Sequence, residues 1–159
     1  MLGIPADKPE TQYGWIEPAR PLYFDLMNIG PVFHIGRFWE KPSSDVAKSL
    51  WREGFFWNSF VMVGWIAALL YLFARALPQL YISFAQSFSL FATSRERETI
   101  VQLYNNIPSV SFSDNVLTHF STECLVLPVR NVLRSDLGEP TRVTSAIAQL
   151  GLHPKWLAV

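Results

Sequence analysis

The sequence predicts an α/β fold in which a few strands of a mixed sheet are flanked by helices. Strand-like runs alternate with helical segments along the 159 residues, which is the pattern of this class. Half of the residues are hydrophobic and 16% are charged, a composition that supports a packed core and excludes a disordered chain. Because the strands are few and no βαβ unit opens the chain, we expect part of a larger domain.

The first third of the chain is expected to hold two short strands and a helix. Prolines near the start predict turns around one extended stretch, Tyr13–Glu17. Val32–Trp39 has the pattern of a strand, with an interruption at His34–Gly36. A serine at 43 or 44 caps a predicted helix that runs to about Arg52, and Gly54 follows its end.

The apolar run from Phe60 to Ala74 is the one segment that resembles a membrane span. It is shorter than the ~20 residues that cross a bilayer. We therefore interpret it as the end of a buried strand, Phe55–Val63, and a helix, Trp65–Leu77, that ends at Pro78. A membrane span stays open as the alternative.

The remainder is expected to be mostly helical, with one strand. Apolar residues at helical spacing predict helices over 79–92 and 94–104, and a short helix is predicted over 113–120. Leu125–Val132 has the pattern of a buried strand. Pro140 opens a final helix to about residue 150.

Charge and cysteine content exclude several classes of protein. The formal net charge is zero, so the chain lacks the electrostatic signature of a protein that binds nucleic acid or an anionic membrane. The single cysteine, Cys124, excludes an intrachain disulfide and is interpreted as structural. Met1–Pro9 lacks the pattern of a signal peptide, and we expect a cytoplasmic protein. His34, His119 and His153 share no ligand spacing and are interpreted as structural.

Two of four short motifs, Phe38–Pro42 and Trp57–Ser59, place polar side chains among bulky apolar neighbours. Sugar hydroxyls need carboxylate and amide partners, and a phosphate needs a cation; an ordinary buried segment needs neither. The motifs are Pro9–Glu17 (PETQYGWIE), Phe38–Pro42 (FWEKP), Trp57–Ser59 (WNS), and Leu127–Val129 (LPV) with Ser135–Gly138 (SDLG).

In order and spacing these motifs resemble the C-terminal half of the sugar-phosphate nucleotidyltransferases, and within them the mannose-1-phosphate guanylyltransferases. The resemblance covers roughly residues 3 to 145. It implies a Rossmann-like nucleotide-diphospho-sugar transferase fold, of which residues 1–159 would be the sugar-phosphate-binding half. The family's glycine-rich N-terminal loop, which cradles the nucleotide, does not occur in the sequence. We therefore expect an incomplete enzyme that is inactive alone.

The resemblance also implies a reaction and a role for each site residue. Mannose 1-phosphate would attack the α-phosphorus of GTP, giving GDP-mannose and pyrophosphate. Lys41 would neutralise the sugar phosphate, Glu40 and Asn58 would bind the sugar, and Gly14 would let backbone and sugar approach closely. Asp136 would act with Lys41 in catalysis by holding Mg²⁺, the implied cofactor.

Each of these residues also has a purely structural interpretation. Glu40 and Lys41 fit a solvated strand end before a proline turn, and Gly14 fits a plain turn. Asn58 fits pairing with a neighbouring backbone group, and Asp136 fits a cap of the last helix.

Three positions depart from the family motifs, so the substrate stays open. Gln12 and Phe60 stand where the family has glycine, and Arg134 stands where it often has tryptophan. The alternatives are the same fold acting on glucose 1-phosphate with UTP or dTTP, and a non-catalytic regulatory or assembly subunit. Two assemblies also stay open: a homo-oligomer, and pairing with a chain that supplies the N-terminal half.

Overall fold

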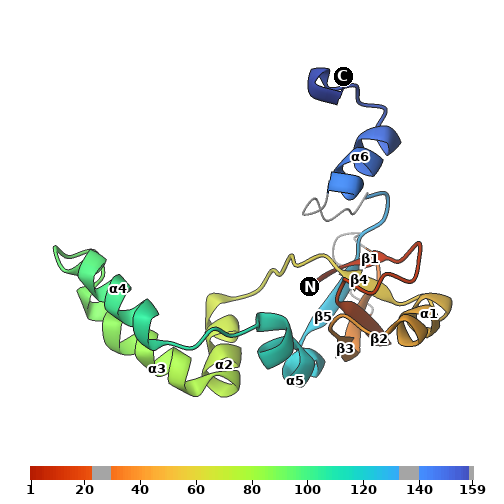
Figure 1. Cartoon of the computed structure of the whole chain (residues 1–159). Helices are drawn as coiled ribbons and strands as arrows, with labels where there is room; N and C mark the ends of the chain where they lie inside the picture. Colours follow the sequence, from red (N-terminus) through yellow and green to blue (C-terminus); the bar gives the residue numbers. More distant parts are fainter. Residues whose placement is uncertain (23–29, 133–139, 158–159) are drawn as a thin grey trace. The chain divides into compact units, whose positions relative to one another are not determined.

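The structure is a computed structural model that describes residues 1–22, 30–132 and 140–157 (Figure 1). The chain forms two compact units, Met1–Val129 and Arg130–Val159. The second unit holds α6, Pro140–Gln149, and the short helix η4, Lys155–Leu157. All other described helices and strands belong to the first unit.

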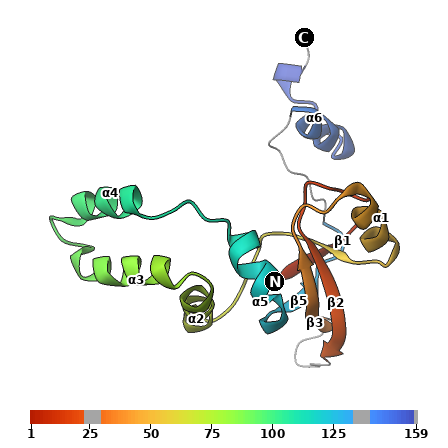
Figure 2. The ribbon, with the colours of Figure 1, turned by 60° about the horizontal axis from the view of Figure 1, so that its bottom comes forward.

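The described strands of the first unit close into a small barrel, in the order β1-β4-β2-β3-β5 (Figure 2). Closure occurs because β1 pairs antiparallel with β4 and parallel with β5, while the remaining pairs are antiparallel. The strands are β1 (Leu2–Pro5), β2 (Trp15–Leu22), β3 (Val32–Trp39), β4 (Phe56–Asn58) and β5 (Leu125–Pro128). The predicted mixture of helices and strands is confirmed. The predicted Rossmann-like sheet is wrong, because β1 joins the two ends of the sheet.

The antiparallel pair of β2 and β3 is longer than the sequence predicts, and its register shifts twice. β2 continues past Glu17 to Leu22 although it contains Pro18 and Pro21, because its pairing with β3 shifts register at both prolines. β3 is continuous, so the predicted interruption is instead a bulge. Gly36 is the extra residue there, between the pairs Glu17–Arg37 and Pro18–Ile35.

Helix α1, Ser44–Arg52, covers one side of the barrel, and its bounds agree with the prediction. Its buried residues, Ala47 and Leu50, pack into a cluster with three aromatic side chains. The Trp57 ring lies edge-on to Tyr13 and to Trp15, with ring centroids 5.2 and 6.1 Å apart. A second cluster comprises Ile16, Ile35, Phe38, Leu117 and Val126.

The expected helices between the barrel strands are present. They are α2 (Ile66–Ala76), α3 (Pro78–Ser87), η1 (Phe88–Leu90), α4 (Glu96–Asn106), the one-turn π-helix η2 (Ser113–Leu117), α5 (Thr118–Phe120) and η3 (Ser121–Glu123). Side-chain contacts join α2 to the segment around η2 and η3, and they include the Arg75 guanidinium over the Phe120 ring at 4.8 Å. The ring centroids of Phe73 and Phe112 lie 5.4 Å apart, and Arg75 Nη1 lies 2.5 Å from Glu123 Oε1.

The predicted strand over Phe55–Val63 is half wrong, since β4 ends at Asn58. The Asn58 side chain accepts a hydrogen bond from the Phe60 N–H (3.1 Å), and the Ser59 hydroxyl donates to the Leu2 carbonyl (2.6 Å). These side-chain bonds mark the end of β4, and the backbone stays bonded to β1 as far as Val61, whose carbonyl accepts the Leu2 N–H at 3.0 Å. The apolar side chains beyond are exposed, Val63 to 83% and Trp65 to 85%. Across the described part of the chain, no helix combines the length and apolar character that a bilayer span requires.

Candidate functional site

Gly14, Glu40 and Asn58 lie together where β2 begins and where β3 and β4 end. The Asn58 N–H donates a 2.7 Å hydrogen bond to the Gly14 carbonyl. A methyl group built on Gly14 would lie 3.0 Å from Glu40 Oε2 and 2.7 Å from Phe38 Cζ. The barrel therefore brings three of the sequence-predicted site residues into contact.

Residue 14 is a glycine because no space is left for a side chain, and not because its backbone conformation requires glycine. Gly14 is buried and is not among the glycines with positive φ. A methyl group 2.7 Å from the Phe38 ring is closer than side-chain carbons approach. The missing side chain leaves space that the Glu40 carboxyl shares.

One oxygen of the Glu40 carboxyl is sheltered from water, although the residue is half-buried. Its Oε2 atom is buried and has no hydrogen-bond partner among the described residues. Burial raises the pKa of this carboxyl above its ordinary value; a hydrogen bond from Ser113 and the charge of Lys41 lower it, and the charge of Asp114 raises it. A buried oxygen without a partner can accept a hydrogen bond from a hydroxyl group of a ligand.

Lys41 lies at the surface, next to Glu40, in an unusual backbone conformation. Its φ is +41°, a region that costs free energy for any residue with a Cβ. Pro42 follows, and a proline further restricts the residue before it. Within the described residues, no ion pair involves the Lys41 ammonium group, so its charge faces solvent.

Asn58 is fully buried, with 0% of its surface exposed. Its Oδ1 atom accepts the Phe60 N–H at 3.1 Å. The structural interpretation of Asn58 predicts such a bond to a neighbouring backbone group. The bond also fixes the orientation of the side-chain amide. Phe60 itself has φ +62°, so the residue that replaces the family's glycine keeps a glycine-like conformation.

Asp136, the predicted metal ligand, lies outside the described residues, as does Arg134. Within the stretches 1–22, 30–132 and 140–157, no group of three or more His, Cys, Asp or Glu side chains is arranged to hold a metal. The Mg²⁺ site therefore stays an expectation of the family resemblance.

Ser113 and Asp114 are functional candidates that sequence reasoning misses. The sequence predicts only that they start a short helix. They do begin η2, but Ser113 is 6% exposed, and both residues affect the pKa of Glu40, which Ser113 lowers and Asp114 raises. The available signal is a serine and an aspartate inside the apolar stretch Phe112–Leu117. Because a helix start explains the same two residues, that signal does not by itself point to a site.

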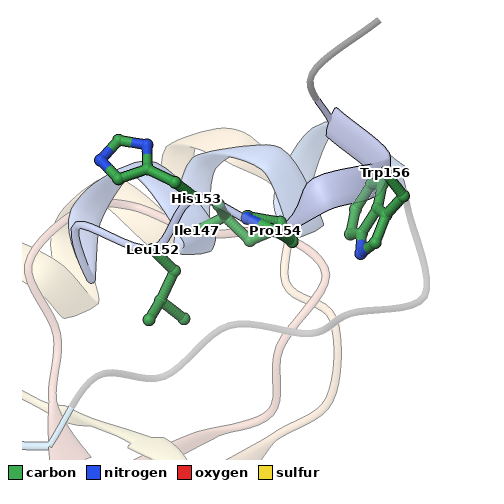
Figure 3. Close-up of a pocket in the computed structure, with 5 residues that line it drawn as sticks. All are labelled: Ile147, Leu152, His153, Pro154 and Trp156. Carbon is green, nitrogen blue, oxygen red and sulfur yellow. The ribbon is translucent and has the colours of Figure 1, made fainter.

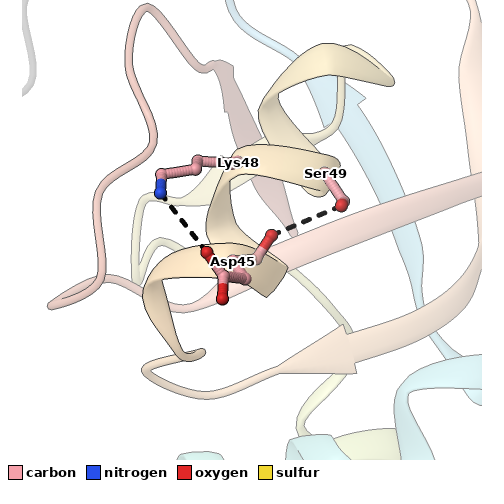
Figure 4. A network of polar contacts seen from close by, with 3 residues as sticks. All are labelled: Asp45, Lys48 and Ser49. Carbon is pink, nitrogen blue, oxygen red and sulfur yellow. Dashed lines mark hydrogen bonds and ion pairs between the residues drawn. The ribbon is translucent and has the colours of Figure 1, made fainter.

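The described residues also line cavities that include none of these site residues. One of about 350 Å³ in the second unit is lined by Ile147, Leu152, His153, Pro154 and Trp156 (Figure 3). Another, of about 400 Å³, is lined by Glu17, Trp39, Asp45, Val46, Ser49, Leu50, Glu53 and Phe55. Near its rim Lys48 Nζ pairs with Asp45 at 3.3 Å and the Ser49 hydroxyl donates to the Asp45 carbonyl (Figure 4). Neither lining includes Gly14, Glu40 or Asn58.

No family model and no curated protein matches the chain, but solved structures do. A crystal structure described as mannose-1-phosphate geranyltransferase from Thermus thermophilus is 26% identical, with a TM-score of 0.62, over 80% of this chain and 33% of that one. A structure described as mannose-6-phosphate isomerase from Helicobacter pylori is 20% identical, with a TM-score of 0.59, over 81% and 48%. The chain thus spans between a third and a half of these structures, which fits a C-terminal half. The predicted resemblance to the sugar-phosphate nucleotidyltransferases is confirmed, at the level of the fold.

Proposed function

We propose that this chain is the sugar-phosphate-binding part of a cytoplasmic nucleotidyltransferase that joins mannose 1-phosphate to GTP. The observation that carries the proposal is the contact of Gly14, Glu40 and Asn58, which come from three separate motifs. The Thermus thermophilus structure, described by its mannose-1-phosphate activity, supports the choice of sugar phosphate.

The chemistry of the site suits a phosphorylated sugar. Glu40 Oε2 is a sheltered acceptor for a sugar hydroxyl. The exposed ammonium of Lys41, on the next residue, supplies the charge that a phosphate needs. Phosphoryl transfer depends mainly on positioning and charge neutralisation, so a site that holds one substrate in place is a substantial part of such an enzyme.

Turnover requires more than these residues, because the matched solved structures are two to three times as long as the matched region. We propose that the nucleotide-binding surface lies on a further stretch of polypeptide. Mg²⁺ and its ligand Asp136 belong to the proposal through the resemblance alone. When bound, Mg²⁺ would supply charge to the phosphates.

A binding experiment tests the proposal without requiring turnover. The ¹⁵N-labelled chain is titrated with mannose 1-phosphate, and amide resonances are followed by NMR. We expect the largest shifts at Gly14, Glu40, Lys41 and Asn58. Glucose 1-phosphate tests the choice of sugar, and inorganic phosphate tests whether the sugar is recognised at all. The proposal is wrong if these resonances do not move, or if inorganic phosphate moves them equally.

A further inference from the structure

We propose that the extended segment before α2 and the outer side of α2 form a docking surface for the further polypeptide that carries the nucleotide-binding surface. The docking surface consists of Val61, Val63, Trp65, Ile66, Leu70 and Tyr71. The identity of the partner rests on the proposed function. The evidence that a partner is required comes from the packing and backbone bonding of this chain, and it holds whichever sugar phosphate the chain binds.

The segment between β4 and α2 has the side-chain alternation of a β-strand. Met62 packs against the second core cluster of the barrel. Val61, Val63 and Trp65, which alternate with Met62 and Gly64, are all exposed. Side chains two residues apart share one face of a strand. The segment, an extended trace before α2 in Figure 1, therefore has one face on the barrel and an apolar face in solvent.

The backbone of this segment is largely unpaired. The Leu2 N–H donates to the Val61 carbonyl at 3.0 Å, which continues the pairing of β1 with β4. Beyond this bond, the N–H groups of Met62, Val63 and Gly64 donate to none of the described residues. An apolar extended segment with unpaired N–H groups is a template on which another polypeptide can add a strand.

Helix α2 is apolar on all sides, which is typical of a helix that is buried on all sides. On one side Leu72 is buried, and the Phe73 ring contacts a ring of the segment before η2. Ile66, Leu70 and Tyr71 lie at helical spacing on another side and are exposed. No charged residue occurs between residues 60 and 74. This composition requires burial, and the described part of the chain does not provide it.

The size and composition of the docking surface fit a permanent partner. From the exposed fractions of its six side chains, its accessible area is on the order of 800 Å², which exceeds the apolar patches that ordinary monomers expose. Each partner contributes an area of this size to a stable interface. Interfaces between permanent partners resemble a domain core cut in two, and the absence of charge over residues 60–74 has that character.

The further polypeptide fits this surface better than a second copy or a membrane does. The Thermus thermophilus structure shares the fold over 33% of its length, so its remainder is large enough to supply both a strand and a covering layer. A second copy paired edge to edge would leave Val63 and Trp65 uncovered, because edge pairing extends a sheet face without covering it. A helix that lies on a membrane is rich in Lys and Arg on its polar side, whereas the single basic residue of α2, Arg75, pairs with Glu123.

A binding experiment with a defined partner tests the docking surface. The full chain is co-expressed with the part of the Thermus thermophilus protein outside the matched region, and the complex is isolated by a tag on that part. We expect a one-to-one complex. Trp65→Lys and Val63→Lys should each lower its yield about tenfold, because each places a charge in an apolar contact. Trp156→Lys is the matched control, since Trp156 is an exposed tryptophan of the second unit. No complex, or equal losses for Trp65→Lys and Trp156→Lys, overturns the proposal.

Amide hydrogen exchange tests whether the partner adds a strand. The N–H groups of Met62, Val63 and Gly64 should exchange at least about tenfold more slowly in the complex than in the chain alone, and unchanged rates overturn the strand pairing. Two other results also overturn the proposal. A stable dimer of the chain alone that Trp65→Lys dissociates assigns the surface to a second copy. Flotation with vesicles of phosphatidylcholine and phosphatidylglycerol that the same variant abolishes assigns it to a membrane.

Sugar binding separates this proposal from the proposed function. If the chain forms the complex but does not bind mannose 1-phosphate, the proposed function fails and the docking surface stands. If the chain binds mannose 1-phosphate but forms no complex, the sugar site stands and the docking surface is wrong.

Discussion

The carboxyl of Glu40 occupies the space that a side chain on Gly14 would need, with only 3.0 Å between Oε2 and the position of a methyl group on Gly14. The two residues come from different motifs, 26 positions apart in the sequence. Neither residue can be explained from its own motif alone. The glycine is required by the Phe38 ring and by the Glu40 carboxyl, which both lie within 3.0 Å of the position of a methyl group, and the carboxyl oxygen has room there because residue 14 is a glycine.

We expect Gly14→Ala to destabilise the fold by about 1–3 kcal/mol, because the new methyl would meet the Phe38 ring at 2.7 Å as well as Glu40. Urea unfolding followed by tryptophan fluorescence measures the change. Gly64→Ala is the matched control, since nothing lies within 4 Å of its methyl position and its φ is not positive. Equal unfolding free energies for the two variants would show that the space at Gly14 is not tightly filled.

Phe60 offers a test of backbone strain. Its φ of +62° costs a residue with a Cβ about 1–2 kcal/mol, and its side chain is 58% exposed. Phe60→Gly and Phe60→Ala both remove the ring, but only glycine removes the Cβ. We therefore expect Phe60→Gly to be about 1 kcal/mol more stable than Phe60→Ala, as measured by thermal unfolding. The reverse order would mean that residue 60 does not keep this conformation.

The raised pKa of Glu40 predicts a pH-dependent stability. A carboxyl whose folded pKa lies above its unfolded value, near 4.5, binds its proton more tightly in the folded state. Its contribution to stability is therefore fully present below the unfolded pKa and is lost as pH rises through the folded pKa. Glu40→Gln cannot ionise, so its stability should rise relative to the wild type as the pH increases above about 4.5.

Unfolding free energies measured as a function of pH test whether folding raises the pKa of Glu40. Glu53→Gln, which alters an exposed carboxylate beyond the end of α1, supplies the baseline. If the unfolding free energy of Glu40→Gln instead falls relative to that of the wild type as pH rises, folding lowers the pKa of Glu40 and the expected sign is wrong.

Lys41 should matter for binding and little for stability. We expect Lys41→Ala to weaken mannose 1-phosphate binding by roughly tenfold to a hundredfold, the effect of losing a charge-assisted contact with a phosphate. Isothermal titration calorimetry measures the affinity. Lys48→Ala is a suitable comparison, because Lys48 is also exposed but pairs with Asp45 on α1. Similar losses for both variants would indicate a general effect of charge and remove Lys41 from the site.

The helices can be predicted from the sequence because local signals define them. Ser43 and Gly54 bracket α1, and prolines open α3 and α6. Strand β1 has no such signal: it is four residues long and ends in Pro5, and its partners in β4 and β5 lie far along the chain. Closure of the barrel therefore depends on tertiary contacts, which the pattern of apolar residues along the sequence does not predict.

The same distinction applies to the site. The FWEKP and WNS motifs are visible in the sequence, and the structure places Glu40 and Asn58 together beside Gly14. Ser113, which lowers the pKa of Glu40, cannot be identified in this way, because η2 reaches the barrel through the packing of Leu117. Short motifs indicate which residues carry chemistry, whereas the residues packed around them follow from the tertiary fold.

The parallel pairing of β1 with β5 has a consequence for the order of folding. It places Gly3 beside Pro128, so the ring cannot be complete until the chain between them has been synthesised and its ends have met. Contacts of such high sequence separation form late, because the entropy of closing the loop must be lost before the pairing compensates for it. Helices α2, α3 and α4 pack against their neighbours in the sequence and can form first. During that interval β1 lacks its partner β5, and mutations that weaken this pairing should slow folding more than they speed unfolding if closure is the rate-limiting step.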